Sequence, residues 1–96
     1  MPKAELAFHD KQTLPDGAIL EMKIWRVRDP VPGSKHGLKY SLFYGYPGRR
    51  LVGYDNERAK GDHRHFQGEE FTYIFTTAEQ LIADFLTDVQ RIRESI

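Results

Sequence analysis

Residues 4–28 read "AELAFHDKQTLPDGAILEMKIWRVR", two extended-type runs joined by the turn signal Pro15-Asp16-Gly17. Proline presets φ for the first turn position, and glycine can adopt the left-handed conformation that closes the turn. Strands joined by so short a connection pair antiparallel, because a parallel pair needs a crossover segment. The stretch therefore predicts a β-hairpin and an antiparallel sheet.

The apolar side of the second run changes near its end. Leu20, Met22 and Ile24 point to one face of the strand, whereas Trp25 and Val27 point to the other. Such a switch is typical of a β-bulge or of a strand end that is covered on both sides. We expect one of these two arrangements between Ile24 and Trp25.

Strand signals continue along the chain with turns and loops between them. Residues 29–37, "DPVPGSKHG", contain two prolines and two glycines and are expected to form a loop. Residues 38–46, "LKYSLFYGY", alternate between two faces, Pro47-Gly48 marks a turn, and 49–55 and 70–75 are further strand candidates. No helical period lies between the early runs, so an antiparallel arrangement is expected.

The C-terminal segment is predicted to be an amphipathic helix. Thr76 and Thr77 are good N-cap residues, with Glu79 and Gln80 at the corresponding capping-box positions. Apolar residues follow at helical spacing, each worth roughly 1.5–3 kcal/mol when buried: Leu81, Ile82, Phe85, Leu86, Val89 and Ile92. The polar residues between them are expected to face solvent or a partner: Asp84, Asp88, Gln90, Arg91 and Arg93.

These patterns predict an α+β fold, with an antiparallel β-sheet of four to six strands packed on one C-terminal α-helix. We expect a single domain over residues 1–96, with the sheet at about 4–75 and the helix at about 77–94. A chain of 96 residues removes only about 60–65% of its unfolded surface from water, which is too little for a second core.

Composition narrows the class of protein. Hydrophobic residues make up 40% of the chain and aromatic residues 12%, as in ordinary globular proteins. No stretch approaches the roughly 18 consecutive apolar residues of a membrane span, and the N-terminus lacks an apolar run of signal-peptide length. We therefore expect a cytoplasmic protein without a membrane partner. Cysteine is absent, which excludes disulfides, thiolate nucleophiles and cysteine zinc sites.

The formal net charge is zero, which argues against a nonspecific nucleic-acid binder, since such proteins usually carry a basic excess. One segment nevertheless leans positive. Residues 49–65 contain two histidines and five basic against three acidic side chains, namely Arg49, Arg50, Arg58, Lys60 and Arg64 against Asp55, Glu57 and Asp62.

A pair of histidines within this segment suggests proton-transfer chemistry. His63 and His65 are two positions apart, so both imidazoles project to one side of an extended segment and Arg64 to the other. Imidazole is the only side chain whose unperturbed pKa is near neutrality, so the pair could supply the base and the acid of metal-free RNA cleavage. The charged phosphorane also needs cations, for which Lys60, Arg58 and Arg64 are candidates.

The other residues of the segment leave alternatives open. Asp62 or Asp55 could orient an imidazole, and Gly61 permits a tight turn or a close approach to a ligand. The histidine pair could instead bind a metal, with a third ligand from Asp55, His9, His36, Glu69 or Glu70. The plainest alternative is a solvated loop of mixed charge, because Asp, Asn and Gly are common turn residues.

Aromatic residues at strand spacing are expected to pack the core, although Trp25, Tyr40, Tyr44 and Tyr54 could also stack nucleobases. In the run at 70–75, the side chains predicted to share one face are Phe71, Tyr73 and Phe75. His9 and His36 are expected at the surface or at strand ends.

Three stretches carry a resemblance to a known family. They are "LPDGAILEMKIWRV" at 14–27, "LVGYDNERAKGDHRH" at 51–65 and "LIADFLTDV" at 81–89. Together they resemble the TumE-type toxins of type II toxin–antitoxin loci over nearly the whole chain, from about Ala4 to Val89. The most specific piece is "KGDHRH", and the sequence looks closer to the branch that contains this motif.

The resemblance implies a prokaryotic toxin whose partner is a helix-turn-helix antitoxin and whose target is RNA or the translation machinery. With the residue chemistry added, the leading expectation is a metal-independent endoribonuclease that needs no cofactor. Its catalytic residues would be Lys60, Asp62, His63 and His65, and its RNA-binding residues Arg58, Arg64 and Asp55. A noncatalytic protein that binds a helix-turn-helix partner is the second expectation, and a metal-dependent hydrolase is the third. A homodimer stays open as an assembly.

Overall fold

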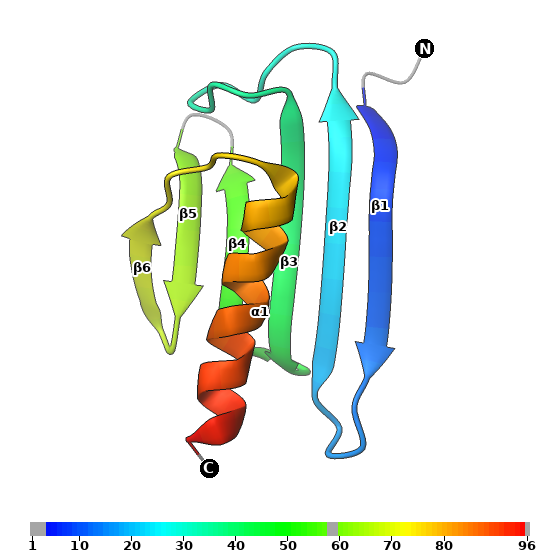
Figure 1. The fold of residues 1–96 in the computed structure, drawn as a ribbon, viewed down its shortest axis with the longest axis vertical. Coiled ribbons are helices and arrows are strands. Elements are labelled where there is room, and N and C mark those ends of the chain that lie inside the picture. Colours follow the sequence, from blue (N-terminus) through cyan, green and yellow to red (C-terminus); the bar gives the residue numbers. More distant parts are fainter. Residues whose placement is uncertain (1–3, 58–59, 96) are drawn as a thin grey trace.

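A six-stranded antiparallel sheet with one helix against it makes up the computed structural model, which describes residues 4–57 and 60–95 (Figure 1). The strands lie side by side in sequence order, so each one pairs with its neighbours along the chain. This confirms the predicted α+β class at the upper end of the expected strand number. The elements are β1 (Ala4–Thr13), β2 (Ile19–Val27), β3 (Leu38–Tyr46), β4 (Arg49–Glu57), β5 (Gly61–Phe66), β6 (Glu69–Thr72) and α1 (Ala78–Glu94).

The first hairpin forms where the turn signal predicted it. Thr13 pairs with Ile19, and the Leu14 amide donates a hydrogen bond of 2.8 Å to the Ala18 carbonyl. Gly17 adopts a φ of 88°, the left-handed conformation that side chains disfavour. The Asp16 carboxylate accepts a hydrogen bond of 3.1 Å from the Ala18 amide, which fixes the turn.

The switch of apolar side in β2 coincides with a bulge in its partner strand. Leu6 pairs with Trp25 and Phe8 pairs with Ile24, so β1 holds one extra residue between them. The bulge alternative is therefore confirmed, although the extra residue belongs to β1. Trp25 lies half-buried on the face away from the helix, with the Lys39 ammonium 5.9 Å from its ring centroid.

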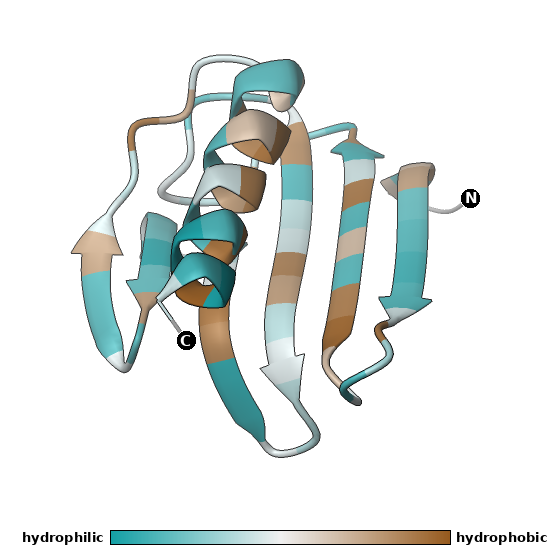
Figure 2. Ribbon diagram, turned by 60° about the horizontal axis from the view of Figure 1, so that its bottom comes forward, coloured by the Kyte–Doolittle hydropathy of each residue, from teal (hydrophilic) through white to brown (hydrophobic). Residues whose placement is uncertain are grey.

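The core lies between α1 and one face of the sheet. Thr77 is the N-cap, and its hydroxyl accepts a hydrogen bond of 3.0 Å from the Gln80 amide, one of the two predicted capping pairs. Figure 2 shows hydrophobic and hydrophilic residues alternating along β2, as expected for a strand buried on one face. The buried apolar side chains from the sheet and helix are Ala18, Leu20, Met22, Ile24, Tyr40, Leu42, Tyr44, Val52, Tyr54, Leu81, Phe85, Val89 and Ile92.

The three core tyrosines bear out the packing prediction, since Tyr40, Tyr44 and Tyr54 are each at most 2% exposed. Two local expectations are wrong. The strand predicted at 70–75 ends at Thr72, because the chain then leaves the sheet to reach the helix. Phe71 stays exposed while Tyr73 and Phe75 pack against the core. Within the described residues, no helix is long and apolar enough to cross a membrane.

Candidate active site on the open face of the sheet

Strand alternation divides the histidine-containing segment between the two faces of the sheet. His63 pairs with Asp55 of β4 and His65 pairs with Gly53, and these residues face away from α1. Arg64 is opposite the core residue Tyr54 and therefore faces the helix. The face away from α1 is called the open face below. The predicted common orientation of the two imidazoles is consistent with this register.

His63 is oriented by the backbone of the preceding turn. Its Nε2 lies 2.6 Å from the Lys60 carbonyl oxygen, and because a carbonyl only accepts, Nε2 must carry the proton. The lone pair is therefore on Nδ1, which is buried without a hydrogen-bond partner among the described residues. The carboxylate of Glu70 lies 3.8 Å from this nitrogen. His63 thus holds a buried basic nitrogen near the half-exposed carboxylate of Glu70.

His65 is held from both sides. The Arg50 guanidinium donates a hydrogen bond of 3.0 Å to Nδ1, so the lone pair is on Nδ1 and the proton on Nε2. Nε2 lies 3.5 Å from Oδ2 of Asp55, which makes the two an ion pair whenever the ring is fully protonated. The same carboxylate is 3.9 Å from Arg50. An arginine, an imidazole and a carboxylate therefore meet on the open face.

Among Arg50, Asp55 and His65, Asp55 has the least favourable environment for its charge. Burial raises the pKa of its carboxyl, and Glu57 adds to the rise, while His65 and Arg50 act in the opposite direction. One oxygen, Oδ1, is buried without a hydrogen-bond partner among the described residues. A buried acceptor left without a donor is costly, so it marks a place where a ligand can supply the missing hydrogen bond.

The side chain of Lys60, another cation predicted for this segment, stands apart from the histidines. The Lys60 side chain is largely exposed and pairs with Glu57 at 3.5 Å, so only its carbonyl contacts His63. Gly61 turns the chain with a φ of 76°, and a Cβ there would lie 3.0 Å from the Gly33 carbonyl oxygen. The predicted close approach is thus to a loop of the chain. Arg58 lies outside the described residues.

Among the residues that the structure describes, metal-ligating side chains do not converge. No group of three or more His, Asp or Glu side chains within 4–57 and 60–95 is arranged to hold a metal ion. His63 and His65 share a face, but His36 lies on the other side of the sheet, where it binds Asp62. The third ligand that a metal site at the histidine pair requires is therefore missing from the described part of the chain.

Comparison with models of known protein families shows to which family the chain belongs. The family model for the toxin TumE matches residues 3–93, almost the whole chain. The chain belongs to the TumE toxin family. This identifies it as a toxin-type component of a toxin–antitoxin system. No curated protein and no solved structure matches it.

The helix side of the TumE chain holds a separate network around Asp62. Its carboxylate accepts hydrogen bonds from the Ser34 hydroxyl at 2.5 Å, from Nε2 of His36 at 2.7 Å and from the Tyr40 hydroxyl at 2.7 Å. Burial acts to raise the pKa of Asp62, but these three hydrogen bonds outweigh it, and the pKa falls below its usual value. The His36 ring stacks on Phe75 with 3.8 Å between centroids. His36 is therefore a half-buried residue of the loop two positions before β3, which fits the expected place near a strand end and not the alternative at the surface.

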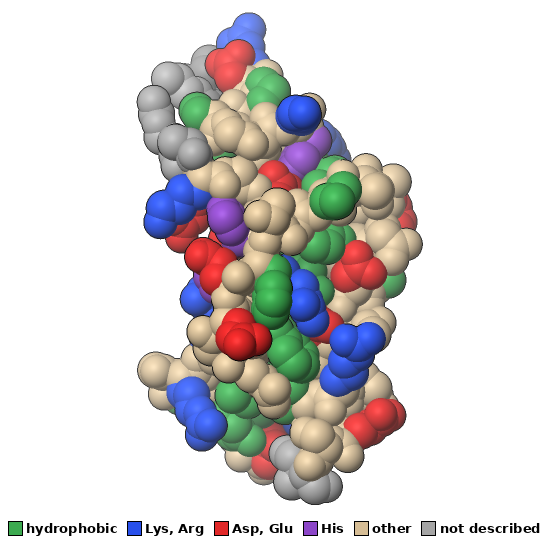
Figure 3. Space-filling view, turned by 90° about the vertical axis from the view of Figure 1, so that its left-hand side faces the viewer, with side chains coloured by type: hydrophobic (Ala, Val, Ile, Leu, Met, Phe, Trp, Pro, Cys, Tyr) green, Lys and Arg blue, Asp and Glu red, His purple; other side chains and the backbone are tan. Residues whose placement is uncertain are grey.

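Arg64 binds the helix. Its guanidinium donates to Asp88 at 2.6 and 3.0 Å and to the Tyr54 hydroxyl at 3.1 Å, and its pKa is raised chiefly by the hydrogen bond to Asp88. Asp88 is only 3% exposed, so the expectation that it faces solvent is wrong. Amphipathic spacing assigns a charged residue to solvent unless a partner of opposite charge is known. On β6, Phe71 packs over the same guanidinium, and Figure 3 shows hydrophobic side chains beside basic ones at this edge of the molecule.

From the sequence, the histidine pair and Asp55 were predicted as site residues, whereas Glu70 was named only as a possible metal ligand and Arg50 only as part of the basic segment. Both reach the histidines across the sheet, from β4 and β6. Only the strand pairing could have indicated their roles, because it places Gly53 of β4 and Glu70 of β6 on either side of His65. The site residues predicted as one cluster therefore lie on two faces, with Asp62 and Arg64 opposite the imidazoles.

Proposed function

We propose that this TumE-family toxin is a metal-independent endoribonuclease whose proton-transfer groups are His63 and His65. The observation that carries the proposal is the open-face group, in which Arg50 and Asp55 hold one imidazole and a backbone carbonyl orients the other. Residues two positions apart in a strand are separated by about 6.6 Å. The imidazole rings of His63 and His65 can therefore flank one phosphate. Arginine beside them supplies a bidentate phosphate donor.

In the proposed reaction, Nδ1 of His63 takes the proton from a ribose 2′-hydroxyl. The 2′-oxygen then bonds to phosphorus while the bond from phosphorus to the 5′-oxygen breaks, giving a 2′,3′-cyclic phosphate. The 5′-oxygen leaves with a proton from the imidazolium of His65. Glu70 must swing away from His63 for the substrate to enter, and both it and Arg50 are exposed enough to move.

Arg50 has two parts in this scheme. In the free protein its guanidinium occupies Nδ1 of His65, so that nitrogen cannot serve a substrate. A bound phosphate competes for the guanidinium, because charged hydrogen bonds to phosphate are among the strong ones. Moving Arg50 to the phosphate stabilises the phosphorane and frees Nδ1 of His65 to carry the second proton. Asp55 then keeps the ring in place.

The test is RNA cleavage by purified protein in the presence of a chelator, with the products analysed for cyclic phosphate ends. His63→Ala and His65→Ala are each expected to lower the rate by on the order of 100-fold or more, as for a lost general acid or base. His9→Ala is the matched control, because His9 lies on the same sheet, paired with Glu21. Full activity of the His63→Ala/His65→Ala double variant would refute the proposal.

A second candidate, a noncatalytic protein that binds a helix-turn-helix antitoxin, is favoured by large apolar side chains left exposed among the described residues: Leu6, Phe8, Phe71, Ile74 and Leu86. Here Leu86→Asp on the helix would abolish complex formation with the product of the neighbouring gene, whereas His63→Ala/His65→Ala would change neither binding nor toxicity. Growth arrest that survives loss of both histidines but depends on these apolar residues would favour this function over the nuclease.

A further inference from the structure

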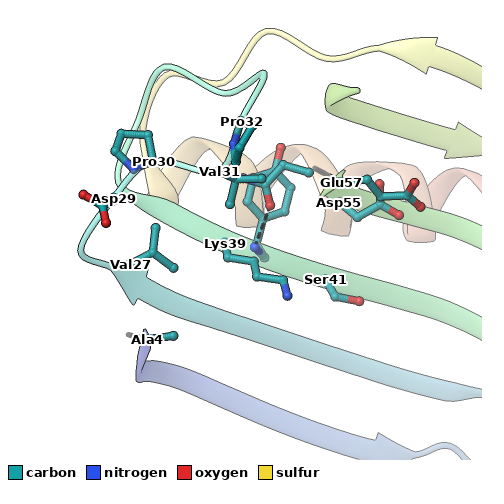
Figure 4. A pocket seen from close by; sticks show the side chains of 12 residues that line it. Ala4, Val27, Asp29, Pro30, Val31, Pro32, Lys39, Ser41, Asp55 and Glu57 are labelled. Carbon is teal, nitrogen blue, oxygen red and sulfur yellow. Dashed lines mark hydrogen bonds between the residues drawn. The ribbon is translucent and has the colours of Figure 1, made fainter. Parts of the chain in front are cut away.

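A cavity of about 740 Å³ lies beside Asp55 on the open face, under the loop that joins β2 to β3 (Figure 4). One wall is apolar and comes mainly from Val27, Pro30, Val31 and Pro32. The polar lining consists of Lys39, Ser41, Asp55 and Glu57. Small-molecule sites typically measure about 300–1,000 Å³ and combine apolar walls with a few polar groups, so the cavity has the size and lining of a ligand site.

Asp55 belongs to this cavity and to the histidine group at once. Its Oδ2 faces Nε2 of His65 at 3.5 Å, while its buried Oδ1 has no hydrogen-bond partner among the described residues. A ligand in the cavity therefore lies beside a carboxylate that is already in contact with an imidazole of the site and that lacks one hydrogen bond. Whatever fills the cavity lies next to the atoms proposed to act on the phosphate.

We propose that the cavity binds one guanine base of the RNA substrate, next to the phosphate that is cleaved. The proposal rests on the proposed nuclease function and adds its base specificity. Single-stranded RNA is usually recognised through splayed-out bases whose faces are packed and whose edges are hydrogen-bonded. Here Pro30 and Val31 can pack against the base, while the carboxylates and Lys39 can read its edge.

Guanine fits the polar lining best. Its Watson–Crick edge offers two adjacent donors, N1–H and the 2-amino group, beside the acceptor O6. The cavity offers the complementary set, with acceptors on Asp55 and Glu57 and a donor on Lys39. Uracil has one donor on that edge, and adenine and cytosine offer a ring nitrogen acceptor that would face the carboxylates. A base that leaves a buried carboxylate unpaired is rejected.

The experiment compares cleavage of RNA oligonucleotides that carry guanosine, inosine or adenosine at one position in an otherwise fixed sequence. Inosine lacks only the 2-amino group, and its substrate is expected to be cut about tenfold more slowly. Glu57→Gln is expected to reduce this ratio towards one by slowing cleavage of the guanosine substrate, and Glu69→Gln on β6 is the matched control. Val31→Trp fills the cavity and is expected to weaken cleavage of every substrate, with Ile74→Trp as its exposed control.

Binding of guanosine 3′-monophosphate and inosine 3′-monophosphate to the wild-type chain provides a second readout that needs no catalysis. Tighter binding of the guanosine nucleotide that Val31→Trp removes supports the cavity assignment, even for a chain that cleaves no RNA. Cleavage without any guanine preference overturns the assignment and leaves the nuclease standing. Equal binding of both nucleotides, unaffected by Val31→Trp, overturns it as well.

Discussion

At the scale of single residues, the buried carboxylate of Asp55 in the candidate site is expected to lower the stability of the folded chain. A carboxyl whose pKa is higher in the folded than in the unfolded chain costs nothing below the unfolded value of 3.8. The cost grows as the pH rises through the folded pKa, so it is larger at pH 7 than at pH 3. We expect Asp55→Asn to raise the urea midpoint of unfolding at pH 7, with no gain at pH 3, and to abolish RNA cleavage.

Asp10→Asn is the control for this comparison. Asp10 accepts a hydrogen bond of 2.9 Å from Gln12 at the exposed edge of β1, and an asparagine can keep that bond. The free energy of unfolding of this variant should stay within about 0.5 kcal/mol of the wild-type value at both pH values, as is usual for surface substitutions. A loss of stability in Asp55→Asn at pH 7 would contradict the account of this carboxylate.

Asp62 is expected to affect stability in the opposite direction to Asp55. Its pKa is lower in the folded chain than the unfolded value of 3.8, because three donors stabilise the carboxylate against the effect of burial. Its contribution is fully present above pH 3.8 and is lost as the pH falls through the folded pKa. We expect Asp62→Asn to cost on the order of 2 kcal/mol at pH 7, the usual scale for hydrogen bonds to a charged group.

The pH dependence separates this account from a simple packing effect. Urea unfolding of wild-type protein and Asp62→Asn, followed from pH 7 down to pH 2.5, should give curves that converge below pH 4. A stability difference that stays constant over that range would show that Asp62 does not act through its charge. Ser34→Ala should behave as a weaker version of the same variant, because Ser34 supplies one of the three donors.

At the scale of elements, α1 contacts β5 through the ion pair of Asp88 and Arg64, in which the Asp88 side chain is 5% exposed and the Arg64 side chain 24%. Removing one partner of a fully buried pair typically costs about 3–5 kcal/mol, because the other charge stays buried and unpaired. Arg64 keeps part of its contact with water, so we expect Asp88→Ala to cause a smaller loss in urea unfolding, on the order of 2 kcal/mol. Arg91→Ala is the control, since Arg91 is exposed and lies 3.9 Å from the same carboxylate, and it should cost less than about 1 kcal/mol.

An Asp88→Leu/Arg64→Met double variant tests whether the loss comes from the unpaired charge. Replacing a buried ion pair by apolar residues of similar volume is often close to neutral. The double variant should therefore recover most of the stability lost in Asp88→Ala. If it is as unstable as the single variant, the network with Tyr54 contributes through its shape and not through charge pairing.

Loss of the N-cap of α1 is expected to lower stability by a smaller amount, and the neighbouring threonine provides a control. Thr77 caps the helix through its hydroxyl, whereas Thr76, also a candidate from the sequence, is not the N-cap. Thr77→Ala is expected to cost about 1 kcal/mol in urea unfolding. Thr76→Ala should leave the midpoint nearly unchanged. Equal losses in both variants would mean that either threonine can cap the helix.

These elements also show which structural features can be predicted from the sequence alone. The hairpin at Gly17, the cap at Thr77 and the common side of His63 and His65 depend on local geometry, and all could be predicted. The partner of Asp62 is His36, 26 positions away in a loop, and the partner of Arg64 is Asp88, 24 positions away on the helix. Such pairs depend on how the loop and the helix lie against the sheet, which no local pattern encodes.

At the scale of the whole molecule, the two faces of the sheet carry different groups. The helix side holds the core and the two carboxylate networks, whereas the open side carries Arg50, Asp55 and the two histidines. Functional groups held without their preferred partners usually lower stability, while structural groups raise it. Variants of the two faces are therefore expected to differ in how activity and stability change together.

The test measures both quantities for one set of variants. Open-face variants Arg50→Ala, Asp55→Asn and His65→Ala should lose RNA cleavage by on the order of 100-fold or more while keeping wild-type stability or exceeding it. Helix-face variants Asp62→Asn and Asp88→Ala should lose activity only as far as their unfolded fraction rises, so activity should return at temperatures where they are folded. Cleavage that follows stability alone across both faces would mean that the open face holds no reacting groups, and the function would then belong to binding of the antitoxin.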